Sequence, residues 1–331
     1  MTKTAFITGA AGFIGSTLAD TLLERGWRVI GIDSFEDYYP RFFKNRNVVQ
    51  AQGNPGYTLH EISLLDLEGG ADNELIRREL ARADVVFHLA AQAGVRASWG
   101  SEFRTYTENN VNATQLLLEA CREAELQRVV YASSSSVYGN TLDLPMREES
   151  RCQPFSPYGV TKLAAEHLCH LYWENFGLPA VSVRFFTVFG PRQRPDMGFH
   201  RFIKAGLEGR PIGVYGDGTQ TRDFTFVGDI VEGLIAAGES KSGTLFNLAG
   251  GHRVTLLETL GVIGEELGSP LELKFTGSQS GDVADTWGSL DRAREELGYE
   301  PMVQLREGVA SEIAWMREMM ADPAYAAATS G

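Results

Sequence analysis

Residues 3–15, KTAFITGAAGFIG, decide the fold of this chain. Residues 3–8 predict a short apolar strand, and the glycine-rich turn at residues 9–15 leads from that strand into a helix. Such a turn leaves backbone N–H groups at the helix N-terminus, where a pyrophosphate can approach them closely. The spacing is Gly-x-x-Gly-x-x-Gly, and the predicted dinucleotide contacts are Gly9, Gly12, Phe13, Ile14 and Gly15.

Asp33 ends the second predicted strand, at residues 27–32. A carboxylate at this point accepts hydrogen bonds from the ribose 2′-hydroxyl of NAD and repels the 2′-phosphate of NADP. The sequence therefore predicts NAD as the cofactor. The alternative for Asp33 is a helix or turn cap within residues 33–37.

Further strands and helices alternate with short connections along the first half of the chain. We expect strands at 57–62, 83–91 and 178–186 and a long helix at 105–125. This alternation predicts an α/β fold with a Rossmann-like, doubly wound parallel sheet. After residue 190 the pattern becomes irregular, so we expect an NAD-binding domain at 1–190, which includes the serine, tyrosine and lysine of the second pattern below. Residues 191–331 are expected to form mainly a smaller, mixed α/β substrate-binding domain. The last residues, from 326, are expected to fray.

A serine-rich strand end and a helix start form the second decisive pattern. Residues 129–139 run from an apolar strand into hydroxyl groups that include Ser134, at the sheet edge where α/β folds bind ligands. Pro157 starts a helix on which Tyr158 and Lys162 share one face. An ammonium beside a phenol lowers the phenol pKa, which suits a general base. The alternative is a solvated helix face behind a serine loop without chemistry.

Composition narrows the classes of function. The chain has 331 residues and a net charge of -13, and it shows no basic stripe, which argues against nucleic-acid binding. No run is long enough for a membrane span, and no signal peptide precedes the first strand. Three widely spaced cysteines indicate free thiols and a cytoplasmic location, and the histidines form no metal-ligand pattern.

Several motifs together resemble the extended short-chain dehydrogenase/reductase superfamily, and the likeness covers nearly the whole chain. The motifs are the glycine turn, Asp33, Asp66-Leu67, the serine-rich strand end and Tyr158-x-x-x-Lys162. Within the superfamily, Val137-Tyr138-Gly139, Arg222-Asp223-Phe224 and Gly281-Asp282 resemble nucleotide-sugar epimerases and dehydratases. The resemblance implies further cofactor contacts at Asp66, Leu67, Leu89, Ala90, Ala91, Asn110, Tyr158 and Lys162.

Two runs, at 88–96 and 184–191, resemble UDP-glucuronate 4-epimerases, and residues 194–197 extend the likeness. Thr187 stands where UDP-glucose 4-epimerases have Asn. Ala93 and Gln279 replace a Lys near the nicotinamide and a phosphate-binding Arg of those enzymes.

The same resemblance implies substrate contacts at Arg96, Ser134, Ser135, Thr187, Arg192, Arg194, Phe199, Tyr215, Arg222 and Asp282. Arginine can bind a carboxylate through two parallel hydrogen bonds, so Arg194 is assigned to the sugar carboxylate. Arg222 is assigned to the diphosphate. The alternative for Arg192 is an arginine that meets only solvent.

The resemblance implies that UDP-glucuronate and UDP-galacturonate interconvert by transient oxidation at C4 with bound NAD. Tyr158, Lys162 and Ser134 are the expected catalytic residues. Ser135 and Ser136 stand where dehydrating or decarboxylating relatives carry acidic residues, which favours an epimerase. The alternatives are a UDP-glucose/UDP-galactose 4-epimerase, a UDP-glucuronate decarboxylase and a non-catalytic NAD-binding regulator.

A homodimer is expected by analogy with these relatives. The helices at 105–125 and 158–176 would form the seam, with Leu116, Leu117 and Leu168 in it. The alternative is that these leucines pack only on their own sheet.

Overall fold

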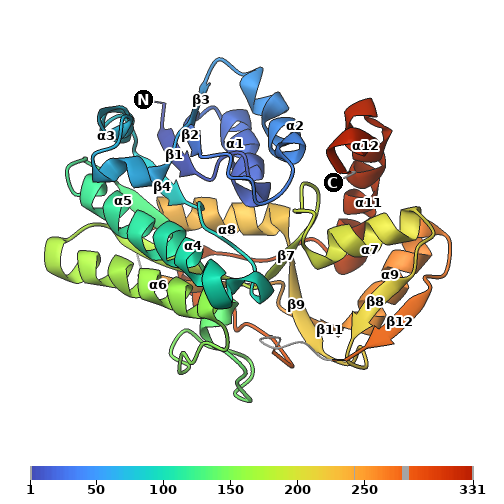
Figure 1. Cartoon of the computed structure of the whole chain (residues 1–331). Helices are drawn as coiled ribbons and strands as arrows, with labels where there is room; N and C mark the ends of the chain where they lie inside the picture. Colours follow the sequence, from blue (N-terminus) through green and yellow to red (C-terminus); the bar gives the residue numbers. More distant parts are fainter. Residues whose placement is uncertain (1, 242, 278–282, 330–331) are drawn as a thin grey trace.

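Seven parallel strands form the main sheet of the computed structural model, which describes residues 2–241, 243–277 and 283–329. The strand order is β10-β6-β5-β4-β1-β2-β3, so the chain winds outward from β1 in both directions (Figure 1). This confirms the doubly wound sheet, whose order reverses between β1 and β4, where such sheets bind ligands. The strands are β1 (Thr4–Thr8), β2 (Arg28–Asp33), β3 (Tyr57–Glu61), β4 (Val85–His88), β5 (Arg128–Ser134), β6 (Ala180–Phe185) and β10 (Leu245–Leu248).

Helices cover both faces of this sheet. One face carries α1 (Phe13–Glu24), α2 (Arg41–Gln52) and α8 (Val227–Glu239), and the other carries α3 (Asn73–Leu80), α5 (Ala113–Cys121) and α6 (Pro157–Phe176). Leu18 and Leu234 are fully buried in the first layer, and Ile76 and Leu117 in the second. Because both faces are buried, the strands read as nearly continuous apolar runs. Leu117 packs on its own sheet, so it cannot line a dimer seam.

The expected helix at 105–125 contains a break. It runs as α4 (Phe103–Thr107), a π-helical turn η4 (Glu108–Asn112) and then α5. A π-turn inside a helix often marks a functional site, and this one carries Asn109 and Asn110. Short 3-10 turns complete this half: η1 (Leu64–Glu68), η2 (Arg96–Ser98), η3 (Gly100–Glu102) and η5 (Ser135–Val137).

A second, smaller lobe follows β6. Its elements are β7 (Thr187–Phe189), α7 (Gly198–Leu207), β8 (Ile212–Tyr215), β9 (Thr221–Phe226), β11 (Arg253–Thr255), α9 (Leu256–Leu267), β12 (Leu273–Thr276) and α11 (Leu305–Ala321). The sheet β11-β9-β7 contains both parallel and antiparallel pairs, while β8 pairs with β12 in parallel. Phe189, Phe199, Ile203 and Ile313 form the centre of a separate hydrophobic core. The expected mixed α/β lobe is therefore present.

The chain crosses between the two lobes more than once. The helix α8 and the strand β10 lie after residue 190, yet they belong to the main sheet, and α10 (Asp291–Leu297) packs against β10. A single boundary at 190 therefore does not separate the lobes.

The end of the chain also differs from expectation. Residues from 326 were expected to fray, but α12 (Pro323–Thr329) is helical because its buried Tyr325 packs against Phe42 and Phe43 of α2. Within the described ranges, no helix is both long and apolar enough to cross a lipid bilayer.

Candidate active site

The glycine-rich turn lies at the carboxyl end of β1 and is tightly built. Gly9 has φ of 71°, a left-handed conformation that favours glycine, and its N–H donates to the carbonyl of Ile32 at 2.8 Å. A Cβ on Gly15 would lie 2.2 Å from the Gly9 carbonyl oxygen, so α1 can start this close only with glycine. Gly12, the N-cap of α1, has no side-chain oxygen to satisfy the first-turn amides. These amides are available to an anionic ligand.

Asp33 is buried at the end of β2, where its carboxylate makes two hydrogen bonds and one ion pair. Its carboxylate accepts hydrogen bonds from the N–H groups of Ala11 (3.1 Å) and Phe35 (2.8 Å). It also pairs with the ammonium of Lys44 at 3.0 Å, and both side chains are almost completely buried. No sequence motif pointed to Lys44, which reaches Asp33 because α2 packs beside α1. Asp33 thus both caps the turn and lines the pocket above it.

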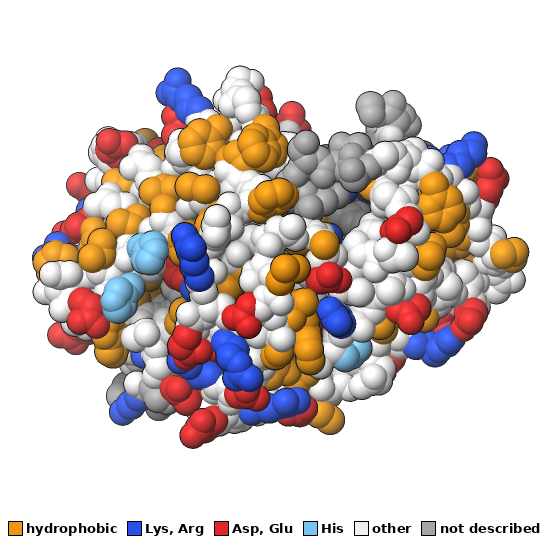
Figure 2. All heavy atoms as spheres, turned by 90° about the horizontal axis from the view of Figure 1, so that it is seen from below, with side chains coloured by type: hydrophobic (Ala, Val, Ile, Leu, Met, Phe, Trp, Pro, Cys, Tyr) orange, Lys and Arg blue, Asp and Glu red, His pale blue; other side chains and the backbone are white. Residues whose placement is uncertain are grey.

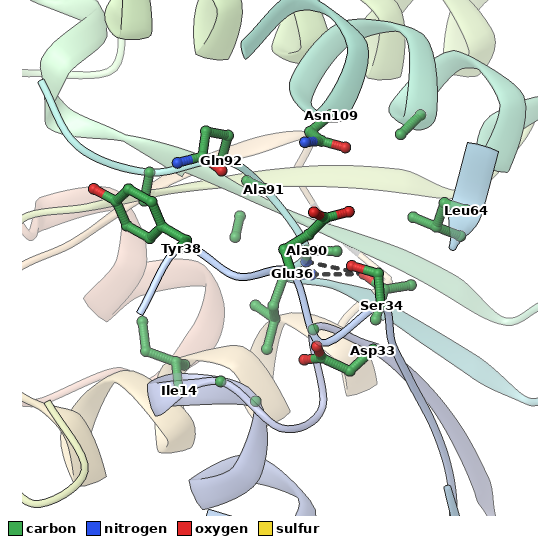
Figure 3. Close-up of a pocket in the computed structure, with 18 of the residues that line it drawn as sticks. Ile14, Asp33, Ser34, Glu36, Tyr38, Leu64, Ala90, Ala91, Gln92 and Asn109 are labelled. Carbon is green, nitrogen blue, oxygen red and sulfur yellow. Dashed lines mark hydrogen bonds between the residues drawn. The ribbon is translucent and has the colours of Figure 1, made fainter. Parts of the chain in front are cut away.

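The cofactor pocket is the cavity above the carboxyl ends of β1, β2 and β4. Of the predicted contacts, it is lined by Gly9, Gly12, Phe13, Ile14, Gly15, Asp33, Leu89, Ala90, Ala91, Tyr158 and Lys162. Ala93, which stands where UDP-glucose 4-epimerases have a Lys near the nicotinamide, lines this pocket too. In Figure 3, Tyr38 and Gln92 lie toward one end of the pocket and Asp33 and Leu64 toward the other.

Three predicted cofactor residues lie beside this pocket rather than in its lining. Ser63 and Leu64 line the pocket, whereas Leu67 is buried in the core below and Asp66 lies against Gly70. 

Asn109 likewise lines the pocket, whereas Asn110 is buried behind it. The amide of Asn110 bonds the backbone of Gln92 in both directions, at 2.7 and 3.0 Å, and donates to Thr161 of α6 at 3.0 Å. Asn110 therefore fixes the loop after β4 relative to the helix that carries Tyr158.

The serine, tyrosine and lysine meet at the edge between β5 and α6. Ser156 caps α6 by accepting the Gly159 N–H at 3.1 Å, which sets the first turn and places Tyr158 in it. Burial raises the pKa of Tyr158, and a hydrogen bond from Ser134 opposes that rise. The Ser134 side chain therefore lies near the Tyr158 hydroxyl, and its predicted role in catalysis stays a prediction.

The predicted lowering of the Tyr158 pKa by Lys162 is wrong. The Lys162 ammonium donates to the carbonyl of Ala132 at 2.8 Å and lies 5.1 Å from the centre of the Tyr131 ring. Burial lowers the pKa of Lys162 to about 7. The pKa of Tyr158 is raised rather than lowered, because desolvation outweighs the nearby donors.

A larger cavity of about 1290 Å³ adjoins the cofactor pocket from the second lobe and is called the substrate cavity. The predicted substrate residues that line it are Arg96, Thr187, Phe199, Tyr215 and Arg222. The guanidinium of Arg96 lies 4.4 Å from the centre of the Tyr215 ring, which joins the loop after β4 to the second lobe. Arg222 donates to the carbonyls of Val283 and Ala284 at 2.7 and 3.0 Å.

Residues 190–196, here the arginine loop, reach both cavities. Arg194 lines the cofactor pocket, while Asp196 lines the substrate cavity, and Tyr38 lines both. Arg192 lies elsewhere, with its guanidinium paired to Asp20 of α1 at 2.6 Å. The structure therefore brings Arg194, but not Arg192, to the cavities, and Arg192 ties the loop to α1 instead of meeting solvent.

Comparison with known proteins identifies the family. The family described as NAD dependent epimerase/dehydratase matches residues 5–249. This chain belongs to that family. An uncharacterized UDP-glucose epimerase of Bacillus subtilis is 42% identical over 316 residues, which cover 95% of this chain and 98% of the relative. The UDP-glucuronate 4-epimerase of Thermodesulfobacterium geofontis is 33% identical over 314 residues, which cover 94% of this chain and 95% of that one.

A solved structure of an epimerase matches this chain over nearly its whole length. It is the UDP-glucuronic acid 4-epimerase from Bacillus cereus in complex with UDP-glucuronic acid and NAD, with a TM-score of 0.89 and 40% identity. The match covers 96% of this chain and 99% of that chain. NAD is the cofactor of this family, and the pocket fits it: the turn excludes any Cβ at Gly15, and the Asp33 carboxylate ends β2.

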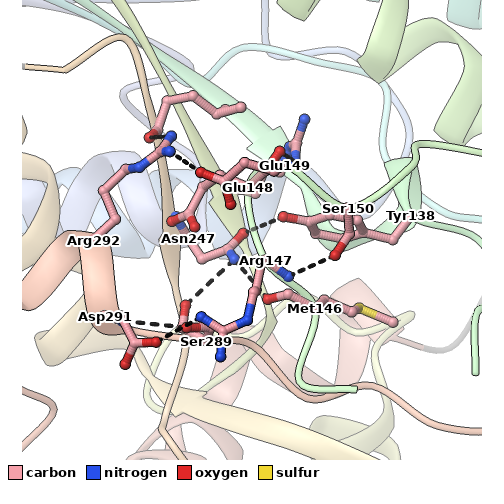
Figure 4. A network of polar contacts seen from close by, with 12 residues as sticks. Tyr138, Met146, Arg147, Glu148, Glu149, Ser150, Asn247, Ser289, Asp291 and Arg292 are labelled. Carbon is pink, nitrogen blue, oxygen red and sulfur yellow. Dashed lines mark hydrogen bonds and ion pairs between the residues drawn. The ribbon is translucent and has the colours of Figure 1, made fainter. Parts of the chain in front are cut away.

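Two motifs typical of epimerases and dehydratases have structural roles. The Tyr138 hydroxyl donates to the Asn247 side chain at 2.7 Å, and Asn247 in turn donates to Glu148 and to the carbonyl of Met146 (Figure 4). Asp223 is fully buried and accepts from the N–H groups of Gly250 and Gly288. 

Burial raises the pKa of Asp223 to about 7. Asp223 thus ties β9 of the second lobe to the backbone after β10 and before α10, and neither Tyr138 nor Asp223 lines either cavity. Asp282, Gly281 and Gln279 lie outside the described residues, and Ser135 begins η5 directly after Ser134.

Proposed function

We propose that this protein is a UDP-glucuronate 4-epimerase, which interconverts UDP-glucuronate and UDP-galacturonate. The observation that carries the proposal is the place of Arg194, which lines the cofactor pocket at its junction with the substrate cavity. A sugar whose C4 faces the cofactor carries its C5 substituent one bond away, so a carboxylate there can meet the guanidinium. The Bacillus cereus relative, solved with UDP-glucuronic acid and NAD, supports the same assignment.

The catalytic residues act on the C4 hydroxyl. Tyr158, as phenolate, takes the proton from O4, and the hydroxyl of Ser134 donates a hydrogen bond to the same oxygen. The glycine-rich turn and Asp33 would hold NAD, which would supply the hydride acceptor for C4 and the same hydride for the opposite face of the 4-keto sugar. Tyr158 then gives its proton back to O4, which leaves C4 inverted. Lys162 lines the same pocket and provides a cation that stabilises the phenolate when protonated.

Retention of the carboxylate follows from the residues after Ser134. The 4-keto form of a uronate is a β-keto acid, which loses carbon dioxide readily. Ser135 and Ser136 offer hydroxyl groups but no carboxylic acid at η5 to assist a second proton transfer. The expected product is therefore UDP-galacturonate rather than a UDP-pentose.

The remaining substrate contacts belong to the same proposal. Thr187 donates beside Arg194, and Arg96, Phe199, Tyr215 and Arg222 bind the nucleotide portion in the substrate cavity. Asp282 stays a predicted contact.

The first experiment is incubation of the purified protein, without added NAD, with UDP-glucuronate or UDP-glucose, followed by chromatography. We expect UDP-galacturonate from the former, and at least a 1000-fold lower rate with Tyr158→Phe, on the order expected for loss of a catalytic base. Conversion of UDP-glucose alone would favour the UDP-glucose epimerase instead. A UDP-pentose product would identify a decarboxylase, and no product from either sugar would favour a regulator.

A homodimer in the cytoplasm completes the proposal. Leu171 and Phe176 of α6 are half exposed, while Leu116 and Leu168 are partly buried against the core. The lower face of the molecule carries several groups of exposed hydrophobic side chains among charged ones (Figure 2). These features support pairing through α5 and α6, and sedimentation at micromolar concentration tests it: a monomer would contradict it. The free thiols of Cys121, Cys152 and Cys169 suit a reducing compartment, which cell fractionation can check.

A further inference from the structure

The guanidinium of Arg194 is held along one edge only. Its Nε donates to Asp196 Oδ1 at 3.0 Å and its Nη2 to Asp196 Oδ2 at 2.9 Å, a bidentate pair. Among the described residues, none accepts a hydrogen bond from Nη1. Because a guanidinium is planar and carries five N–H donors, the edge formed by Nη1 and Nη2 can still bind a second carboxylate.

Tyr38 contacts both members of this ion pair. Its hydroxyl donates to Asp196 Oδ2 at 3.3 Å, and its ring centre lies 5.9 Å from the Arg194 guanidinium. Burial raises the pKa of Tyr38 to about 12, so the hydroxyl remains a donor at neutral pH. Tyr38 lies in the loop after β2, at the end of the cofactor pocket seen in Figure 3. The arginine loop is thus tied to the lobe that binds the cofactor.

Tyr38 is in turn packed against the loop that leads to the catalytic tyrosine. Gly94 has φ of 108°, and a Cβ there would lie 2.7 Å from the Tyr38 hydroxyl oxygen. The Tyr106 hydroxyl donates to the Gly94 carbonyl at 2.7 Å, and the Tyr106 ring lies edge-on to the ring of Tyr158 at 6.2 Å. A continuous chain of contacts therefore sets the position of Arg194 relative to Tyr158.

We propose that Asp196 and Tyr38 are positioning residues that hold Arg194 by its Nε edge and present its Nη1 edge to the substrate carboxylate. This rests on the proposed function, because it assumes a uronate. Asp196 touches Arg194 rather than the substrate, so it acts through the orientation of that side chain. If Asp196 instead occupied the edge that the substrate needs, it would compete with the uronate, and its removal would strengthen binding.

Calorimetric titration of the NAD-loaded Tyr158→Phe protein separates these possibilities, because this variant does not turn over the ligand. The titrants are UDP-glucuronate, UDP-glucose and UDP. In that background, Asp196→Asn should raise the Kd of UDP-glucuronate on the order of tenfold, as expected for disturbing hydrogen bonds to a charged group. The Kd values of UDP-glucose and UDP should stay within about twofold, because neither ligand has the carboxylate. Tyr38→Phe, which removes only a hydroxyl, should also raise the Kd of UDP-glucuronate relative to that of UDP-glucose, but by a smaller factor.

The control variant is Glu300→Gln. Glu300 forms a bidentate pair with Arg294, at 2.7 and 2.8 Å, and neither residue is among those that line the two cavities, so its loss should leave all three affinities unchanged. If Asp196→Asn raises the Kd of all three ligands equally, Asp196 has a merely structural role and the proposal is overturned. Tighter binding of UDP-glucuronate would show competition and also overturn it. If the parent protein itself does not prefer UDP-glucuronate to UDP-glucose, the proposed function fails instead.

Discussion

Asp33 and Lys44 show how one buried ion pair can set the choice of cofactor. Asp33 repels a 2′-phosphate by its charge, and it also keeps the ammonium of Lys44 occupied at 3.0 Å. Both side chains are buried, so solvent screens their interaction little. Lys44 lines the cofactor pocket, and without Asp33 its ammonium would be available to an anion there.

Asp33→Ser should therefore shift the preference from NAD toward NADP. We expect the ratio of the two dissociation constants to change on the order of tenfold or more, because a repelling charge is lost and a cation is released. Fluorescence titration of the cofactor-free protein with NADH and NADPH measures this. In the double variant Asp33→Ser/Lys44→Met, the gain in NADPH affinity should disappear; if it persists, Lys44 has no part in the choice.

Side-chain direction is the part of the site that the sequence could not supply. The family resemblance implied cofactor contacts at Asp66, Leu67 and Asn110, but the 3-10 turn η1 and the π-turn η4 present Leu64 and Asn109 to the pocket instead. In a regular helix, periodicity identifies the facing residue, whereas these irregular turns change the angle per residue. The sequence could not predict the lowered pKa of Lys162 either, because that pKa depends on burial of the side chain in the folded protein.

Among the elements, α1 depends most strictly on a single residue type. Gly15 lies in its first turn, and the glycine-rich turn folds back so closely that a Cβ would meet the Gly9 carbonyl at 2.2 Å. Regular helix propensity would favour alanine there by about 1 kcal/mol, so the packing requirement overrides propensity.

Gly15→Ala should reduce stability and release NAD, because α1 must move away from the turn that binds the pyrophosphate. A loss of about 1–3 kcal/mol in the free energy of unfolding is expected for such overpacking. Urea unfolding and the NAD content of the purified protein test this. Gly261→Ala in α9 is the matched control: a Cβ there meets nothing within 4 Å, so the change should be neutral or stabilising. Equal effects of the two substitutions would contradict the steric explanation.

For the whole molecule, the important feature is that the main sheet is completed late in the chain. Strand β10 pairs with β6 through the register Leu245 to Ser182, and α8 covers β4, β5 and β6. Periodicity in the sequence could not reveal that the chain returns to the first lobe after residue 190, because long-range pairing is not encoded in local patterns. The number and type of the early strands, in contrast, followed directly from their apolar runs.

A fragment of residues 1–190 should not fold independently, although the sequence placed a boundary there. It lacks Ile230 and Leu234, which are fully buried against the sheet, and it leaves the edge of β6 unpaired. We expect the fragment to be insoluble, or to show no cooperative unfolding and no NAD binding, in far-UV circular dichroism and cofactor titration. A soluble fragment that binds NAD would restore the boundary at 190.

The late position of β10 also affects the chain during its synthesis. A ribosome releases β6 well before it has made β10, so the nascent chain carries an open strand edge while the intervening helices and strands are translated. An open edge can pair with the strands of neighbouring nascent chains. We therefore expect the yield of soluble protein to depend on the speed of translation between β6 and β10, which the codons of the messenger RNA set.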